Sequence, residues 1–325
     1  MPLNFSSGGS MNKQQTIAQT VSLSGVGLHS GQPVTLAIHP APAGTGIIFV
    51  RNTQGGQEHC PATIHHLRPI NLCTTLGVNG FKIQTVEHVL SALAGLEIDN
   101  AFIELDAEEV PAVDGSAAPF VELIHRAGIV SQEAPRTYLK IIHPIKIQKE
   151  DRTLTVLPSV LPKVSYSIEY AHPLIQRQTY EFEWTPAEFQ RSIASARTFA
   201  FSKEVEWLWS VGLGRGGTLD NTLVFSDTDL LNEDGFRFPD ECVRHKILDL
   251  IGDLSLLGIP VIGHFIADRT GHSAHAEMVK AILDQPSAWI LLNAEDEEHP
   301  IHCHKISSSS LQHYKKQSQP ACPSA

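Results

Sequence analysis

The sequence lacks any apolar run approaching ~18 residues, which excludes a membrane-spanning helix. It also lacks an excess of basic charge: 24 Lys and Arg residues stand against 35 Asp and Glu residues, and the net charge is −11. A general nucleic-acid-binding protein is therefore not expected, because phosphate binding relies on clustered Lys and Arg side chains. No apolar core of a secretory signal follows the polar N-terminus, MPLNFSSGGS.

Cysteines are few, and no CxxC motif pairs them. The five are scattered along the chain, at Cys60, Cys73, Cys242, Cys303 and Cys322. A set that is odd in number and sparse does not make a disulfide framework and favours a reducing compartment. We therefore expect a cytoplasmic protein.

The rest of the composition is that of a globular protein, with 42% hydrophobic, 18% charged and 7% aromatic residues. The length of 325 residues suggests two domains, since a domain typically has ~150 residues. The unusual count is that of histidine, with 17 residues, which directs attention to metal binding and acid–base chemistry.

Two stretches of the chain carry the same order of elements. In each, a helix with a histidine in its first turn leads into a strand, and a turn after the strand re-enters a helix. His88 precedes Gly115 by 27 residues, and His245 precedes Gly271 by 26 residues. This recurrence indicates an internal duplication. With strand-like segments before each unit, the predicted fold class is α+β, with two similar domains that are each a β-sheet packed with helices.

The elements of this prediction follow from hydrophobic patterning and turn residues. They are strands within 14–50, a helix at 85–95, a strand at 100–105, a helix at 120–128, strands from 138 onwards, a helix at 240–257, a strand at 260–267, a turn at 270–276 and a helix at 276–284. Thr85 is a good N-cap for the first helix, and Gly95 is placed to end it.

The predicted domains are bounded by polar segments. They cover residues 13–133 and 137–306, with a disordered extension at 1–12 and a loose tail at 307–325. The polar stretch 131–136 contains Pro135 and is the best candidate linker between the domains.

The segment with the most candidate functional side chains is His245-Lys-Ile-Leu-Asp249-Leu-Ile-Gly-Asp253. On a helix with ~100° per residue, His245, Asp249 and Asp253 fall at about 0°, 40° and 80°. Apolar residues occupy the opposite side, so one face is core and the other presents an imidazole and two carboxylates. His and Asp four residues apart can reach one cation, and zinc accepts both ligand types. A solvated polar face explains the same spacing equally well.

Glu87 and His88 supply what a zinc hydrolase would still need. Catalytic zinc usually has three protein ligands, and His88 is a candidate third ligand beside His245 and Asp249. Glu87 is then a candidate general base for the attacking water. Two surface residues in the first turn of a helix are the ordinary alternative for this dipeptide.

The turn Thr270-Gly271-His272 follows an apolar strand, where loops often present functional side chains. His272 is a candidate general acid for a leaving amine, and Asp253 is placed to hold its protonated form. A turn histidine without a role is the alternative.

Two further motifs match the patterns of functional sites but are interpreted as chance matches. The stretch 212–217 matches GxGxxG, but a dinucleotide fingerprint must follow a strand and open a helix, so we expect a flexible loop that borders a substrate. The second is a cluster near the C-terminus that lacks the spacing of a tetrahedral site, so adventitious metal binding is its interpretation. Its members are His299, His302, Cys303 and His304.

Seven motifs and a Gly-His pair at 271–272, in order along the chain, resemble the zinc-dependent UDP-3-O-acyl-N-acetylglucosamine deacetylases. The motifs are SGVGLHSG (24–31), HPAPAGTGIIF (39–49), TVEHVLSALAGLEIDN (85–100), VDGSAAPF (113–120), SARTFAF (195–201), NEDGFRF (232–238) and RHKILDLIGDL (244–254). The resemblance extends from about residue 14 to 295, and the one departure within a motif is Ala200, where the family often has glycine.

The resemblance implies a hydrolase that removes the N-acetyl group of UDP-3-O-(3-hydroxyacyl)-N-acetylglucosamine in the committed step of lipid A biosynthesis. It implies an active site in the cleft between two similar α+β domains. It also implies one Zn²⁺ per chain, bound by His88, His245 and Asp249.

The same resemblance implies roles for the residues around the metal. Glu87 is the general base, and His272 is the general acid with Asp253 as its partner. Thr198 and Lys246 stabilise the oxyanion and contact substrate, and Phe199 and Phe201 lie near the substrate. An acylated UDP-sugar is the expected binding partner, without nucleic acid and without an obligate protein partner.

Two alternatives stay open on the sequence alone. One is a zinc hydrolase that acts on a different N-acyl sugar or on a peptide amide. The other is a non-catalytic protein that binds nucleotide sugars. The presence of Glu87, His272 and all three candidate ligands argues against the second.

Overall fold

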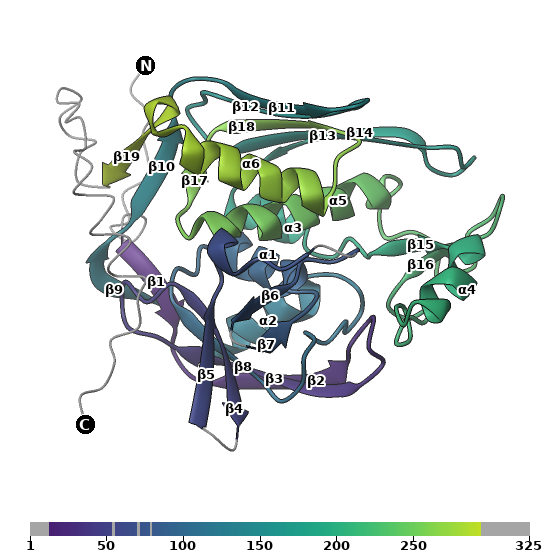
Figure 1. Ribbon diagram of the computed structural model, residues 1–325, viewed down its shortest axis with the longest axis horizontal. Coiled ribbons are helices and arrows are strands. Elements are labelled where there is room, and N and C mark those ends of the chain that lie inside the picture. Colours follow the sequence, from purple (N-terminus) through teal and green to yellow (C-terminus); the bar gives the residue numbers. More distant parts are fainter. Residues whose placement is uncertain (1–12, 54–55, 70–71, 79, 294–325) are drawn as a thin grey trace.

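Two five-stranded sheets form the outer layers of the molecule, and helices fill the space between them (Figure 1). The computed structural model describes residues 13–53, 56–69, 72–78 and 80–293. The expected extension at 1–12, the tail at 307–325 and the His299, His302, Cys303 and His304 cluster lie outside the described residues.

The strands occupy both halves of the chain. They are β1 (Lys13–Ile17), β2 (Val21–Val26), β3 (Pro33–Pro40), β4 (Ile47–Thr53), β5 (Gly56–Pro61), β6 (Leu76–Val78), β7 (Phe81–Ile83), β8 (Ala101–Leu105), β9 (Ile129–Pro135), β10 (Thr137–Ile141), β11 (Ile145–Lys149), β12 (Arg152–Leu157), β13 (Lys163–Tyr170), β14 (Gln176–Glu183), β15 (Phe199–Phe201), β16 (Leu223–Phe225), β17 (Val261–Ile262), β18 (His264–Asp268) and β19 (Trp289–Asn293).

The α-helices alternate with them. They are α1 (Glu87–Gly95), α2 (Ala118–Ala127), α3 (Pro186–Ser192), α4 (Ser202–Ser210), α5 (Glu241–Leu254) and α6 (His272–Asp284), and short 3₁₀ segments cover Ile64–His66, Ser255–Leu257 and Pro286–Ala288.

Both five-stranded sheets have the same strand order. The first is β2-β3-β8-β4-β5, and the second is β11-β12-β18-β13-β14. In each sheet as described, one pair is parallel. It joins the central strand to the strand that comes third in sequence order within that sheet, β8 with β4 and β18 with β13. A helix precedes the central strand and another follows it in both halves, which confirms the predicted α+β class with two similar units.

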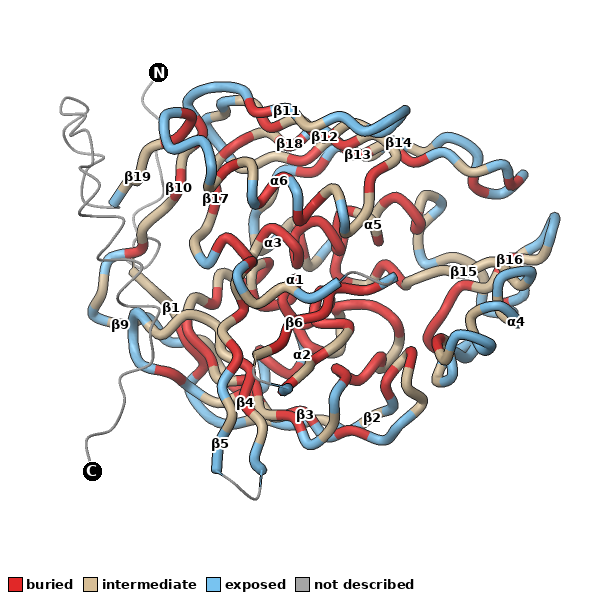
Figure 2. Tube along the Cα trace, in the orientation of Figure 1, coloured by how far each residue is buried: buried red, intermediate tan, exposed pale blue. Residues whose placement is uncertain are grey.

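The helices lie inside because the inner face of each sheet is apolar. In β3 the residues alternate between exposed or half-buried and buried positions, as expected for a strand with one face on the core. Figure 2 shows the buried positions concentrated in the helices between the sheets. The helices α1 and α5, one from each half, pack directly against each other at the centre.

Three local predictions need correction. Thr85 does not cap α1: it has a positive φ of 58°, and its hydroxyl donates to Glu109 Oε1 at 2.9 Å. Strands resume before 138, because Ile129–Pro135 forms β9 and pairs with β1, and the role of 131–136 as a linker stays a prediction. The bounds 13–133 and 137–306 for two domains stay a prediction.

The third correction concerns the turn at 270–276. The helix α6 begins at His272 itself, four residues before its predicted start. The strand before it is divided at Gly263 into β17 and β18. His272 is therefore placed by the first turn of a helix and not by a loop.

Candidate active site

The site is built where α1 and α5 touch. Glu87 and His88 form the first turn of α1, and His245, Asp249 and Asp253 follow one another along α5. All five residues are buried, with 1 to 4% of each exposed. The interpretation of these residues as solvated surface positions is therefore wrong, because the polar face of α5 points at the other half of the molecule.

Three side chains from these helices converge as candidate metal ligands. His88 Nε2 lies 3.8 Å and His245 Nε2 lies 3.4 Å from the same oxygen, Asp249 Oδ1. Ligands on a tetrahedral zinc ion, with bonds of ~2.0–2.1 Å, are separated by about 3.3 Å. The three atoms thus stand close to the edges of such a tetrahedron.

One buried atom of this group is orphaned. Asp249 Oδ1 is shielded from solvent and has no hydrogen-bond partner among the described residues. A buried carboxylate oxygen without a donor is costly in free energy unless a cation satisfies it. The residues present therefore fit a divalent cation with nitrogen and oxygen ligands.

The surroundings prepare the three groups for a metal. His245 Nδ1 donates to the Ala196 carbonyl at 3.0 Å, which leaves Nε2 as the free lone pair. Burial, together with His245, lowers the pKa of His88 to about 3, and burial also lowers the pKa of His245, so both rings are neutral.

The third group, the Asp249 carboxylate, is paired with a lysine: Lys246 Nζ donates to Asp249 Oδ2 at 2.9 Å. Burial opposes ionisation of Asp249, but Lys246 and the nearby histidines hold its pKa well below the usual range.

Glu87 and His272 face each other beside the ligands, with Oε1 and Nε2 3.8 Å apart. Burial raises the pKa of Glu87 to about 8 against the opposing effect of His272. Burial would lower the pKa of His272, but Asp253, Asp249 and Glu87 together raise it to about 9. His272 Nδ1 donates to Asp253 Oδ2 at 2.8 Å, as the proposed pairing requires.

Sequence reasoning missed three residues around Asp253. Thr74 Oγ1 donates to Asp253 Oδ1 at 2.5 Å, and the Thr74 amide donates to Glu87 Oε2 at 3.1 Å. His275 Nδ1 donates to Asp253 Oδ2 at 2.7 Å, and the Tyr166 hydroxyl lies behind it. Of these three residues, only His275 is linked to the site by a signal in the sequence, which is its helical spacing from His272.

The ARTFAF segment (196–201) borders the site from the second half. Phe199 stacks edge-on to His245 with ring centroids 6.5 Å apart, and Lys246 Nζ lies 5.6 Å from the Phe199 ring centroid. The Thr198 amide donates to the Gly115 carbonyl at 2.9 Å, which ties the segment to the first half. Phe199 and Phe201 belong to an aromatic cluster in which each ring contacts at least one other: Tyr170, His172, Phe199, Phe201, Phe225 and Phe236.

A buried ion pair fixes this segment to the start of α5. Arg197 Nε donates to Glu241 Oε1 at 2.9 Å, and the Arg197 amide donates to the same oxygen at 2.9 Å. Arg197 is 1% exposed and Glu241 is fully buried. The pair therefore sets the position of Thr198 relative to the helix that carries His245.

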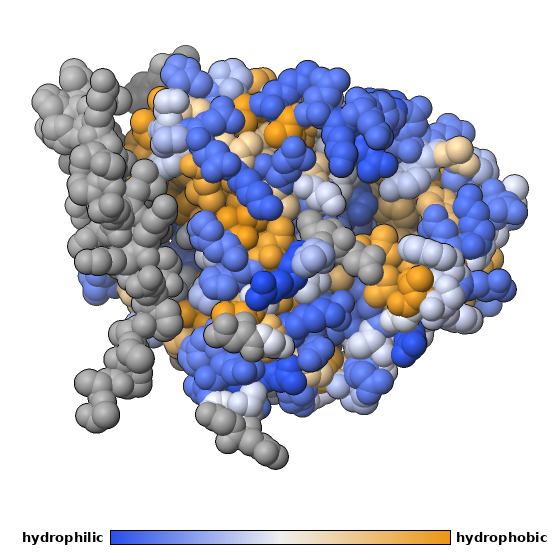
Figure 3. All heavy atoms as spheres, in the orientation of Figure 1, coloured by the Kyte–Doolittle hydropathy of each residue, from blue (hydrophilic) through white to orange (hydrophobic). Residues whose placement is uncertain are grey.

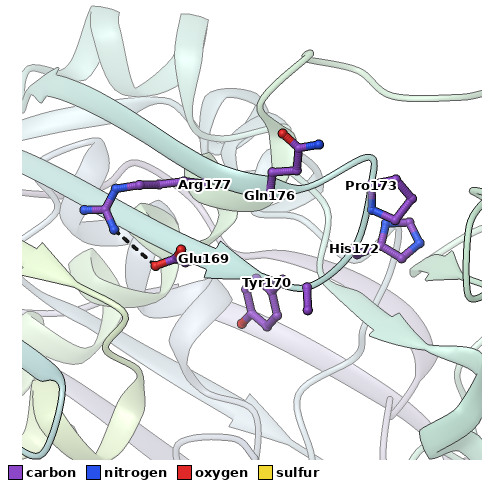
Figure 4. Close-up of a pocket in the computed structure, with 7 residues that line it drawn as sticks. Glu169, Tyr170, His172, Pro173, Gln176 and Arg177 are labelled. Atoms are coloured by element: carbon purple, nitrogen blue, oxygen red, sulfur yellow. Dashed lines mark hydrogen bonds and ion pairs between the residues drawn. The ribbon is translucent and has the colours of Figure 1, made fainter.

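An open pocket of about 450 Å³ lies next to the aromatic cluster (Figure 4). Its lining comes from the end of β13, the start of β14 and the turn between them, and includes Tyr170, His172 and Arg177. A second pocket, of about 240 Å³, shares Glu169 and Tyr170 and reaches Thr270. None of the three candidate metal ligands, His88, His245 and Asp249, lines either pocket.

The stretch 212–217 forms a connection between a helix and a strand, and its role beside a substrate stays a prediction. It follows the helix α4 and precedes the short strand β16, so it is not a dinucleotide fingerprint. The Gly214 amide donates to His29 Nδ1 at 3.4 Å, which joins this loop to the first half. Figure 3 shows apolar side chains gathered where α4, β15 and β16 project from the body. Trp207, Trp209 and Val211 are exposed there.

Within the described ranges, no helix has both the length and the apolar character needed to span a membrane. The three cysteines that the structure describes, Cys60, Cys73 and Cys242, are buried free thiols.

Comparison with known proteins gives one consistent family. The family model of UDP-3-O-acyl N-acetylglycosamine deacetylase matches residues 14–284. The UDP-3-O-acyl-N-acetylglucosamine deacetylase of Myxococcus xanthus (strain DK1622) is 45% identical over 285 residues, which are 88% of this chain and 91% of the relative. That of Hahella chejuensis (strain KCTC 2396) is 43% identical over 288 residues, covering 88% and 95%. The fold, the buried His and Asp group and these matches agree, and the chain belongs to the UDP-3-O-acyl-N-acetylglucosamine deacetylase family.

Proposed function

We propose that this protein hydrolyses the N-acetyl group of UDP-3-O-(3-hydroxyacyl)-N-acetylglucosamine, releasing acetate and the free amine. In this proposal one zinc ion per chain is bound by His88, His245 and Asp249. The single observation that carries it is Asp249 Oδ1, which is buried without a donor beside two imidazole nitrogens at 3.4 and 3.8 Å. The family membership supplies the substrate.

Zinc suits this donor set better than a hard cation. Two neutral imidazoles and one carboxylate are typical zinc ligands, and three protein ligands leave a fourth position open. When bound, zinc supplies an acidified water and a Lewis acid for the carbonyl oxygen. Amide hydrolysis needs both, because an amide is a poor electrophile with a poor leaving group.

Glu87 acts as the general base. Its carboxylate accepts a proton from the attacking water while the water oxygen forms a bond to the N-acetyl carbon. The Thr74 amide, which donates to Oε2 at 3.1 Å, orients the carboxylate and leaves Oε1 toward His272. Glu87 lies outside the converging group of His88, His245 and Asp249, so its carboxylate is free to act as the base.

His272 acts as the general acid. Because Nδ1 is hydrogen-bonded to Asp253, the proton available for transfer is the one on Nε2. The raised pKa of about 9 keeps the His272 ring protonated near neutral pH. His272 gives this proton to the glucosamine nitrogen as the carbon–nitrogen bond breaks. Asp253 stays ionised through the step: burial disfavours its charge, but His272 and His275 lower its pKa to about 2.

Thr198 and Lys246 stabilise the negative charge that develops on the carbonyl oxygen. Lys246 is cationic, since Asp249 raises its pKa despite the burial. Phe199 and Phe201 contact the substrate near this point, and the adjoining aromatic cluster offers apolar surface beside a polar centre. A substrate with both a diphosphate and an acyl chain requires such a combination.

The partner in this proposal is the acylated UDP-sugar alone, without nucleic acid, and the location is the cytoplasm. The buried free thiols at Cys60, Cys73 and Cys242 are consistent with a reducing compartment.

The test is acetate release from the acylated UDP-N-acetylglucosamine, measured against the unacylated sugar nucleotide, together with zinc stoichiometry. We expect rapid release only from the acylated substrate and about one zinc per chain. Equal rates on both compounds would indicate a hydrolase of a different N-acyl sugar. A metal-loaded protein that releases no acetate from either would contradict the proposed activity.

A further inference from the structure

His275 is a buried histidine next to the site that the proposed chemistry does not use. It lies on α6, three residues after His272, and is fully buried. Its Nδ1 donates to Asp253 Oδ2 at 2.7 Å, and the same oxygen accepts from His272 Nδ1 at 2.8 Å. Two histidines therefore share one carboxylate oxygen, while Thr74 donates to the other oxygen at 2.5 Å.

The far side of the His275 ring is anchored in the second sheet. Its Nε2 lies 3.1 Å from the Tyr166 hydroxyl and 3.4 Å from Thr270 Oγ1. Tyr166, on β13, is fully buried and also donates to the Thr270 carbonyl at 2.9 Å. A continuous hydrogen-bond network thus runs from the second sheet through His275 to Asp253.

The protonation of this ring follows from its partners. The Asp253 oxygen can only accept, so the proton lies on Nδ1 and Nε2 faces the two hydroxyls. Burial lowers the pKa of His275 against the opposing effect of Asp253, which keeps the ring neutral. A neutral ring of fixed tautomer holds the Asp253 carboxylate in place and does not compete with His272 for the positive charge.

We propose that His275 is a positioning residue: it fixes the plane of the Asp253 carboxylate and thereby aims His272 at the leaving amine. This inference rests on the proposed deacetylase function. Donors on both carboxylate oxygens prevent rotation of Asp253, and the bond from Asp253 to Nδ1 then sets the direction of His272 Nε2. His275 touches none of the three proposed ligands and lines neither pocket, so its effect falls on proton transfer and not on binding.

The test compares His275→Leu with His275→Asn in the zinc-loaded full-length protein. Leucine fills similar space without a donor, whereas the asparagine amide places an N–H group near the position of Nδ1. We expect kcat of the Leu variant to fall by up to ~100-fold, because small misplacements of a catalytic group have effects of that size. KM and zinc stoichiometry should stay unchanged, and the Asn variant should recover most of the rate. A purely structural role would lower both variants together with the melting temperature.

The matched control is His264→Asn, on β18, where the histidine contacts Ser165 outside this network. If the Leu variant folds poorly, His275→Gln replaces it, since its amide is displaced toward Nε2. The Gln variant should then be slow while the Asn variant is fast.

A second readout does not depend on turnover. In protein with ¹⁵N-labelled histidine, the His275 ring should show a proton on Nδ1 with a downfield chemical shift, absent in His275→Asn. A proton on Nε2 alone would overturn the proposal. So would an active wild-type protein whose Leu and Gln variants keep full kcat. A wild-type protein that releases no acetate would instead contradict the proposed function, which separates the two failures.

Discussion

Gly252 on α5 lies directly against the backbone of Glu87 on α1. A Cβ atom at position 252 would stand 2.1 Å from the Glu87 carbonyl oxygen, which is main chain and cannot rotate away. The glycine therefore permits the close approach of the two helices that brings His88 to the residues of α5.

We predict that Gly252→Ala forces α1 and α5 apart and reduces zinc affinity and deacetylase activity together. Overpacking of a close contact typically costs ~1–3 kcal/mol of folding stability. The measurements are metal stoichiometry, acetate release and the midpoint of urea unfolding. Wild-type values of all three in the Ala variant would show that the helices tolerate greater separation.

Glu87→Gln should lose most turnover and still bind about one zinc per chain. The amide keeps the shape of the side chain but cannot accept the proton of the attacking water, and loss of a general base costs ~10²–10⁴-fold. The matched control is Glu122→Gln, an exposed position on α2. Near-normal kcat in Glu87→Gln would remove Glu87 from the base role.

The pH dependence of kcat/KM should be bell-shaped. His272 must be protonated to act as the acid, so the rate falls as pH rises through its pKa. The value of about 9 belongs to the metal-free site, and a nearby cation lowers it. Glu87 must be ionised, so the rate also falls at low pH. This acid limb lies below the value of about 8 for the metal-free site, because a nearby cation favours the carboxylate. The alkaline limb should disappear in His272→Ala, and an unchanged limb there would assign it to another group.

Chelation of zinc should lower the melting temperature of the wild-type protein. A ligand that binds only the folded state stabilises it by mass action, by ~2.7 kcal/mol at a concentration 100 times Kd. His88→Ala should weaken zinc binding and reduce the effect of the chelator, whereas the exposed His65→Ala should not. Equal chelator shifts in wild type and His88→Ala would exclude His88 as a ligand.

Arg197→Ala should destabilise the fold by ~3–5 kcal/mol, because it leaves the fully buried Glu241 without its cationic partner and with only the backbone amides of residues 197 and 237 as donors. The double variant Arg197→Ala with Glu241→Ala should lose less than the sum of the two single losses. Urea unfolding of the four proteins gives these values. Additive losses would mean that the two side chains do not interact.

The sequence predicted the centre of the site because its chemistry is local in part. His245, Asp249 and Asp253 share one helix face, and the helix wheel places them together without tertiary information. The wheel does not reveal whether that face meets water or another helix. That distinction depends on Gly252 and Glu87, which come from different halves of the chain.

The missed residues are those that reach the site only through the tertiary fold. Thr74 lies 179 residues from Asp253 in the chain, and Tyr166 lies 109 residues from His275. Neither stands in a spacing that marks it as functional. The predicted start of α1 at Thr85 is wrong for a related reason. The Thr85 hydroxyl donates a hydrogen bond to Glu109 on a neighbouring segment, and this tertiary contact overrides the preference of threonine for the N-cap.

The identical strand order of the two sheets also bears on why the two sides of the site carry different chemical groups. If one ancestral unit was duplicated, its central helix first packed against a copy of itself, and a symmetric pair presents the same groups from both sides. The equivalent helices still offer His88 and His245, but four residues further on one has Ala92 and the other Asp249. This inequality, together with those between Glu87 and Arg244 and between Val89 and Lys246, breaks the twofold symmetry, so that a substrate meets a base on one side and a charged lysine–aspartate pair on the other.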